Sequence, residues 1–238
     1  MVALTVNTHS SNIRCLNIFF KYMEKYIGHS YFENVYLFID PCDYVAPEYV
    51  TTIEYNPNDC FTYQMGSCLS QVKEDILLYC NEDYIFYEQA RLDVANELLE
   101  KLINSNFSFI KFVHTDIEPY KMYAPNLLVI DKTSVNNFSQ TLSFWKTQDI
   151  LNIHRHSPPA GIGLKGNLIG HLEDAAKDVC RHLNTAGLCY YNGEPKRGGA
   201  HFDTEVFPHV ASALVKGSWN IHEYPELKQI LEKENIEC

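Results

Sequence analysis

The sequence contains no apolar run of about 18 residues, the length that a membrane-spanning helix requires. Its first residues, MVALTVNTHSS, lack the basic region and long apolar segment that together mark a secretory signal. The eight cysteines include no CxxC pair, so they suit reduced thiols better than a disulfide framework or a structural zinc site. These absences predict a soluble, intracellular protein without a membrane span.

Positive charge is also scarce, because 19 Lys and Arg residues face 30 Asp and Glu residues, which gives a formal net charge of -11. This balance argues against a broad surface for nucleic acid or for an anionic membrane. Any phosphate must therefore be met by a local basic pocket or by a metal ion. With 46% hydrophobic residues, the 238-residue chain has enough apolar material for one large domain, which we expect to span residues 1–238.

Strand-like and helical segments alternate along the first half of the chain. Continuous apolar runs predict strands over Val2–Val6, Val35–Ile39, Val50–Glu54, Ile76–Tyr79 and Phe109–Val113. Apolar residues at helical spacing predict helices over 13–27, 61–72 and 92–102. This succession predicts an α/β fold whose mostly parallel sheet is covered by helices on both faces.

The second half is less regular. Strands are predicted over 127–130 and 140–145, and a terminal helix over 225–232. A further helix is predicted from about Glu173 to Ala186, with Gly187 as its stop. The segment from Asn192 to Asp203, NGEPKRGGAHFD, combines glycines, two cations, a histidine and an acid, and we expect it to act as a mobile lid.

Two adjacent acids follow the predicted buried strand in the stretch DILLYCNEDYIFYEQ, where Asn81, Glu82 and Asp83 end the apolar run. The carboxyl ends of the strands in an open α/β sheet are where ligands bind. Neighbouring carboxylates there are costly unless a cation or hydrogen-bond donors compensate them. The motif therefore favours a metal site, although a helix cap or a surface ion pair is the alternative.

Several segments resemble glycosyltransferases of the GT-A fold. VALTVNTHSSNIRCLNIFFKYM, VYLFID and FTYQMGSCLSQVKEDILLYCNEDY are similar, in this order, to their nucleotide-binding half, which carries an acidic DXD-type motif after a buried strand. NNFSQTLSFWKTQDIL and HFDTEVFPHVASALVKGSWN resemble segments of short GT-A proteins of bacteria and viruses. Asn81 departs from the first Asp of the DXD pattern, which leaves the metal mainly to Asp83.

The resemblance implies a GT-A (Rossmann-like) α/β/α sandwich, with residues 1–115 as the nucleotide-binding half and 116–238 as the acceptor-binding half. It implies an enzyme of the hexosyltransferase type in the cytoplasm, or in the host cytoplasm if a virus encodes it. The enzyme would move a sugar from a nucleotide-sugar donor, expected to be a UDP-sugar, to a carbohydrate or other hydroxyl acceptor with inversion. The expected cofactor is manganese or magnesium, since an oxygen-preferring cation can neutralise the charge on the leaving diphosphate.

Two other functions stay open. A sugar nucleotidyltransferase has a related fold, but its glycine-rich phosphate loop has no counterpart in VNTHSSNIR, which contains no glycine. A non-catalytic module that binds nucleotides or sugars is the second alternative, because Asn81 could reflect an incomplete metal site.

The candidate residues on the donor side come from five parts of the chain. The metal candidates are Asp83, His201 and Asp203, and the nucleotide candidates are Thr8, Asp40, Gln64, Glu82, Lys196 and Arg197. Lys196 and Arg197 could close over the diphosphate as charge-assisted donors. The alternatives are a solvent-exposed loop histidine at His201 and a simple turn at Asp40, which Pro41 follows.

On the acceptor side, Glu173 and Asp174 in GHLEDAAKDV resemble the acidic pair that opens a helix in many inverting GT-A enzymes. Either carboxylate could take the acceptor proton as a general base. The alternative is structural, because the helix macrodipole favours acids in the first turn of any helix. Trp145 is the first candidate for an aromatic platform on which an acceptor sugar stacks.

Overall fold

The computed structural model describes residues 1–114, 120–134, 136–159, 168–194, 196–197, 201–202, 204–215 and 217–237. Its centre is a nine-stranded sheet with the order β3-β2-β1-β4-β9-β6-β10-β8-β7. The strands of this sheet are β1 (Val2–Asn7), β2 (Val35–Ile39), β3 (Val50–Glu54), β4 (Ile76–Asn81), β6 (Phe109–Lys111), β7 (Lys121–Ala124), β8 (Leu127–Ile130), β9 (Ser143–Lys146) and β10 (Gly187–Tyr190). The helices are α1 (Ile13–Tyr26), α2 (Phe61–Leu69), α3 (Leu92–Ile103), α4 (Thr147–His156), α5 (Leu168–His182) and α6 (Pro225–Lys233).

The sheet is mostly parallel, as the alternation of strands and helices predicts. Strands β3, β2, β1 and β4 pair in parallel, and β6 pairs in parallel with β10. Strand β9 lies between β4 and β6 and is antiparallel to both, so β6 runs in the same direction as β4. The carboxyl ends of β1, β2, β4, β6 and β10 therefore meet at one edge of the sheet, where α/β proteins bind ligands.

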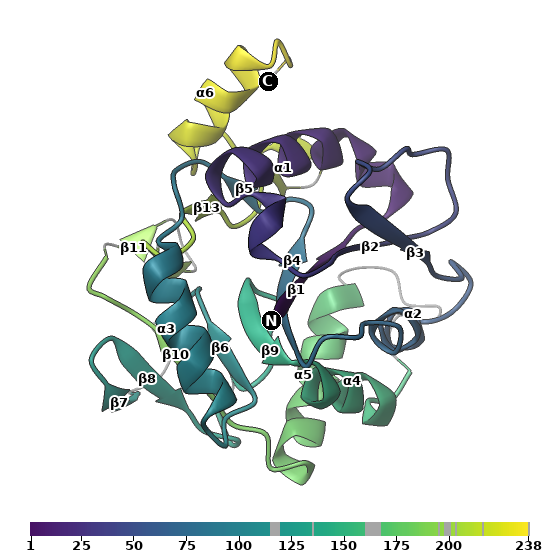
Figure 1. The fold of residues 1–238 in the computed structure, drawn as a ribbon. Helices are drawn as coiled ribbons and strands as arrows, with labels where there is room; N and C mark the ends of the chain where they lie inside the picture. The colour runs from purple at the N-terminus through teal and green to yellow at the C-terminus, as the bar shows by residue number, and fades with distance from the viewer. Residues whose placement is uncertain are drawn as a thin grey trace.

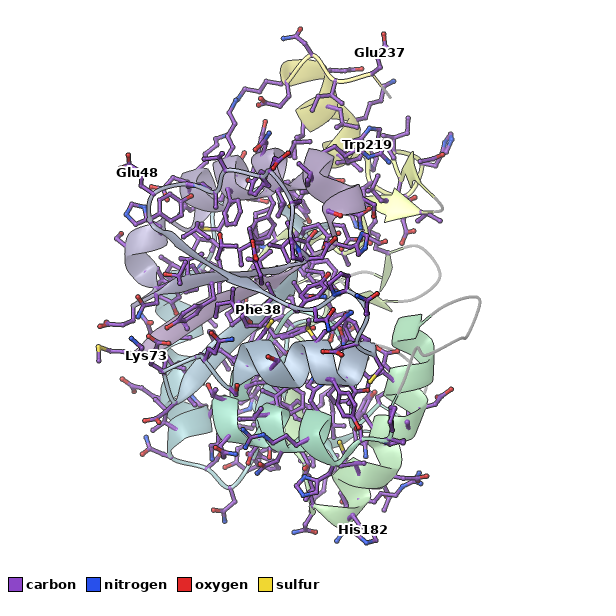
Figure 2. All side chains as sticks on the ribbon, turned by 90° about the vertical axis from the view of Figure 1, so that its right-hand side faces the viewer. Phe38, Glu48, Lys73, His182, Trp219 and Glu237 are labelled. Atoms are coloured by element: carbon purple, nitrogen blue, oxygen red, sulfur yellow. The ribbon has the colours of Figure 1, made fainter. Side chains whose placement is uncertain are left out.

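Helices cover both faces of the sheet (Figure 1). The buried faces of α1, α3 and α6 share one core with residues such as Leu4 and Leu78, whereas α2, α4 and α5 pack over the other face around Tyr79. Figure 2 shows Phe38 of β2 inside the molecule and His182 at the far end of α5. None of the helices in the described ranges has the length and apolar character to cross a bilayer.

Three short two-stranded pairs accompany the central sheet in the described part of the chain. Strand β5 (Ile85–Phe86) pairs with β13 (His209–Val210), and β14 (Leu214–Val215) pairs with β15 (Ser218–Trp219). Strand β11 (Lys196–Arg197) pairs with β12 (His201–Phe202) inside the segment that we expected to be a lid. The pairing of β5 with β13 brings the late part of the chain beside the residues that follow β4.

The predicted helix at 173–186 is wrong at both ends. The buried stripe of α5 (Leu172, Ala176 and Cys180) belongs to a helix that begins at Leu168 and ends at His182. Asn184 adopts the left-handed conformation with a φ of 59°, which is typical of a residue just after a helix. Gly187 instead begins β10, where a Cβ atom would come within 2.2 Å of the Phe109 ring.

Candidate functional site

Strands β1 and β4 end side by side, because Asn7 and Asn81 are register partners in the parallel pair. The backbone N–H of Glu82 still donates to the carbonyl oxygen of Asn7, at 3.3 Å. Thr8, Glu82 and Asp83 therefore leave the sheet together at its carboxyl edge. This arrangement places the acid pair, Glu82 and Asp83, close to Thr8, the nucleotide candidate that follows the first strand.

The acid pair is enclosed by neutral donors. Glu82 is 6% exposed, and its Oε1 atom accepts a hydrogen bond from Nδ2 of Asn12 at 2.7 Å. Burial, together with the negative charge of Asp83, raises the pKa of Glu82 to about 8, although hydrogen bonds from Asn12 and Thr8 oppose the rise. Asp83 is half-buried, and the Ser212 hydroxyl donates to its Oδ2 atom at 3.3 Å. Burial raises the pKa of Asp83 to about 6.

The donor set of this pair fits a hard divalent cation. Magnesium and manganese are bound through one or two carboxylates together with substrate phosphates, and a cation would offset the raised pKa values of both acids. Within the described part of the chain, no group of three His, Cys, Asp or Glu side chains gathers around a possible metal position. The side chain of His201 and the whole of Asp203, the other two metal candidates, lie outside the described residues.

Asp40 holds the turn that precedes α1. It is 7% exposed, and its two carboxylate oxygens accept from the backbone N–H and the hydroxyl of Ser10, both at 2.6 Å. Burial would raise the pKa of Asp40, but the two bonds from Ser10 and the nearby His9 outweigh it and hold the pKa below its usual value. The same turn, Ser10–Asn12, positions the Asn12 side chain to donate its hydrogen bond to Glu82. Asp40 therefore supports the acid pair indirectly.

Gln64 and Arg197, two further nucleotide candidates, have other partners in the structure. Nε2 of Gln64 donates to the carbonyl oxygens of Asn56 and Asp59, and so ties down the loop before α2. The guanidinium of Arg197 binds both carboxylate oxygens of Glu226 on α6, at 2.9 and 3.0 Å. Arg197 thus pairs with the C-terminal helix, and the side chain of Lys196 lies outside the described residues.

Gln140 connects Glu173 to the end of β4 through hydrogen bonds. Its Oε1 atom accepts from the backbone N–H of Gln140 at 2.8 Å. The carbonyl oxygen of Gln140 in turn accepts from Nδ2 of Asn81 at 3.3 Å and from the hydroxyl of Tyr84 at 2.7 Å. An Asp at position 81 would set a carboxylate oxygen against this carbonyl, which gives Asn81 a structural reason to depart from the DXD pattern.

The structure separates the two candidate bases. The Asp174 side chain is 80% exposed and forms a surface ion pair with Lys177 at 3.0 Å, whereas Glu173 is half-buried against Gln140.

Trp145 is a correction to the predicted acceptor platform. Its side chain is fully buried in β9, with its ring centroid 4.5 Å from that of Phe109 and 5.9 Å from that of Phe138. Its indole N–H donates to the Ser143 hydroxyl at 2.9 Å. A sugar cannot reach a ring that the core covers on all sides, so Trp145 stabilises the sheet instead.

Several residues around the acids were missed in the sequence. Asn12 and Ser10 belong to the polar turn NTHSSN after the first strand, and its position at a strand end is a signal that could have identified them. Gln140 and Ser212 come from later loops and reach the site only through tertiary contacts. No local pattern marks them.

Comparison with known proteins identifies the fold. No protein-family model matches the sequence, and no curated protein matches it. Staphylococcus aureus TarS residues 1–349 superimpose with a TM-score of 0.52 at 10% identity over 85% of this chain. The same piece in complex with UDP-GlcNAc gives 0.53 at 13% identity over 84%, and the longer TarS structure gives 0.50 at 12% over 85%.

The protein thus shares its α/β fold, with a large, mostly parallel central sheet, with TarS. The chain spans 60% of the length of the two shorter TarS chains and 36% of the longer one.

Proposed function

We propose that this protein is a glycosyltransferase that moves a sugar from a nucleotide-sugar donor, a UDP-sugar, to a hydroxyl acceptor. The observation that carries the proposal is the acid pair of buried Glu82 and half-buried Asp83. The pair lies at the carboxyl edge of the sheet, in a fold shared with a protein crystallised with UDP-GlcNAc. Two adjacent acids with raised pKa values are suited to a site whose ligand includes a cation, because the cation stabilises both carboxylates in their charged form.

On the donor side, Asp83 would hold the cation, with Glu82 beside it. When bound, manganese or magnesium would offset the negative charge that develops on the departing diphosphate. Ser212 orients the Asp83 carboxylate, and Asn12 and Thr8 orient Glu82. Because these donors are neutral, they leave the negative charge of the pair available to a cation.

On the acceptor side, Glu173 is the better candidate for the general base. Its hydrogen bond from Gln140 fixes one carboxylate oxygen and leaves the other to take a proton from an acceptor hydroxyl. Attack from this side, opposite the departing diphosphate, would invert the configuration at the anomeric carbon. Asp174, exposed and paired with Lys177, is the less suitable of the two.

The experiment that tests this function is a thermal-shift panel of UDP and UDP-sugars, with and without manganese. A ligand at 100 times its Kd stabilises the native state by about 2.7 kcal/mol, which raises the melting temperature by several degrees. We expect the shift to need manganese and to disappear in Asp83→Asn. Asp178→Asn is the matched control, because this side chain is 81% exposed on α5.

A donor screen that follows UDP release then tests for transfer. If no nucleotide shifts the melting temperature of the wild-type protein with manganese, the proposed function is wrong. If UDP-sugars bind with manganese but no UDP is released with any acceptor, the protein is a binding module and not a transferase.

A further inference from the structure

Three amide atoms at the carboxyl edge of the sheet are buried without a hydrogen-bond partner among the residues that the structure describes. They are Oδ1 of Asn7, Oδ1 of Asn81 and Nε2 of Gln140. Asn7 is 8% exposed and Gln140 is 4% exposed. Leaving such an atom unpaired costs about 1–3 kcal/mol, and native proteins retain few of them without a functional reason.

These three side chains form one cluster. Asn7 and Asn81 are register partners on adjacent parallel strands, so their side chains leave the same face of the sheet. Gln140 is joined to Asn81 by the bond from Nδ2 to its carbonyl oxygen. The cluster therefore spans the ends of β1 and β4 and the loop before β9.

Hydrogen bonds within the structure already occupy one end of the side-chain amides of Gln140 and Asn81. The hydroxyl of Tyr79 donates to Oε1 of Gln140 at 2.8 Å, so Nε2 is the end that lacks a partner. Nδ2 of Asn81 donates to the Gln140 carbonyl oxygen, so Oδ1 is its remaining end. Flipping the Asn81 amide would set two acceptors against each other. The Tyr79 hydroxyl can donate or accept, and the structure places Oε1 of Gln140 against it. The cluster thus offers two acceptors and one donor.

This pattern selects a neutral, hydroxyl-bearing ligand. A phosphate or carboxylate would bring its negative charge against two amide oxygens, and a cation would meet the amino group of Gln140. Hydroxyl groups both donate and accept, so vicinal hydroxyls of a sugar ring can satisfy all three atoms.

The position of the cluster indicates which sugar this is. Asn81 lies two residues before Asp83, the expected cation ligand, and the peptide group of Gln140 binds Glu173, the expected base. In the proposed reaction the transferred sugar must lie between the departing diphosphate and the base. Resting on the proposed function, we infer that Asn7, Asn81 and Gln140 form the subsite that binds the hydroxyls of the transferred sugar and selects among donors.

The test compares the affinities of UDP and UDP-sugars, measured by calorimetry with manganese present. UDP-glucose and UDP-GlcNAc serve as probes, and the donor that binds wild type more tightly is carried through the variants. Asn7→Ala removes one acceptor. Gln140→Glu keeps the acceptor for Tyr79 and replaces the unpaired donor by an oxygen. We expect each variant to weaken UDP-sugar binding about tenfold while the Kd of UDP changes less than twofold. Gln148→Glu, at an exposed position of α4, is the matched control and should change neither affinity.

The possible outcomes distinguish a failure of the subsite assignment from a failure of the proposed function. If the variants weaken UDP and UDP-sugar equally, or weaken neither, the subsite assignment is overturned although the protein still binds nucleotide sugars. If wild type binds neither ligand, the proposed function itself has failed. Should a variant not fold, deoxy analogues of the UDP-sugar decide with wild type alone. Loss of one ring hydroxyl should then cost about tenfold, and unchanged affinity across the series would overturn the inference.

Discussion

Raising the pH from 6 to 8 should strengthen magnesium binding to the donor-loaded protein by roughly two orders of magnitude. The reason lies in the acid pair, whose members titrate together with pKa values of about 6 and about 8. A cation beside Asp83 and Glu82 favours the form in which both carboxylates are charged, so binding must expel the protons that the pair holds.

The size of the effect follows from these two pKa values. At pH 6 the pair holds about one and a half protons, and at pH 8 it holds about half a proton. Each proton released changes the apparent affinity tenfold per pH unit. Integrated over the two units, the apparent Kd for magnesium should fall roughly 100-fold. In Glu82→Gln only Asp83 titrates, and the same change of pH should then alter the Kd only about twofold.

The assay is calorimetric titration of magnesium into protein that is saturated with UDP-GlcNAc, whose esterified diphosphate has no proton that titrates between pH 6 and 8. Repeating the titration in two buffers with different heats of ionisation counts the protons released. An equal Kd at both pH values would refute the reasoning, and so would a 100-fold change that persists in Glu82→Gln.

Without metal, the raised pKa of Glu82 means that the folded state binds a proton more tightly than the unfolded chain does, so the apo protein loses stability as the pH rises from about 4.5 through about 8. Glu82→Gln should therefore raise the melting temperature of the apo protein at pH 8 but not at pH 4. Burial lowers the pKa of His154 from 6.5 to about 4, so acid favours the unfolded chain. Between pH 7.5 and 5 the free energy of unfolding, measured by denaturant titration, should therefore fall by about 2 kcal/mol because of His154, and His154→Leu should abolish this part of the fall. Glu173→Gln should abolish sugar transfer while donor binding survives, whereas Asp174→Asn should keep near-normal turnover. Residues 192–203 should gain hydrogen-exchange protection when nucleotide binds, as expected of a lid that closes over the diphosphate.

Controls and contrary results are available for each of these four predictions. His156→Leu, on an exposed turn of α4, should leave the acid sensitivity in place, and a flat profile in both His variants would contradict the assignment. An unchanged apo melting temperature of Glu82→Gln at pH 8 would show that Glu82 is not strained. Retention of the donor's anomeric configuration in the product would refute Glu173 as base, and equal exchange with and without nucleotide would refute the lid.

Local patterns in the sequence predicted much of the sheet. Val35–Ile39 was identified to the residue, because a continuous apolar run has one interpretation when polar residues bound it on both sides. The helix after Leu168 was misplaced because its acids at 173 and 174 resembled a first turn, whereas its buried stripe defines a longer helix. Helix α4 was missed, since the notable features of its sequence are the two histidines and not its apolar face.

The site was less predictable than the fold, because tertiary contacts assemble it. Asn81-Glu82-Asp83 could be found from its place after a buried strand, but nothing local says that Gln140 will connect Asn81 to Glu173. Trp145 shows the opposite error, since a large aromatic residue has the same appearance in a sequence whether it lines a cleft or fills a core.

The position of β9 has a consequence for how the chain folds during synthesis. Strands β4 and β6 do not pair with each other, and both pair with β9, which leaves the ribosome after them. Until residue 146 emerges, one edge of β4 keeps a row of unpaired N–H and C=O groups, which can pair with another nascent chain. The first 115 residues alone should therefore associate or recruit chaperones, and co-expressing a later fragment that contains β9 should rescue their solubility.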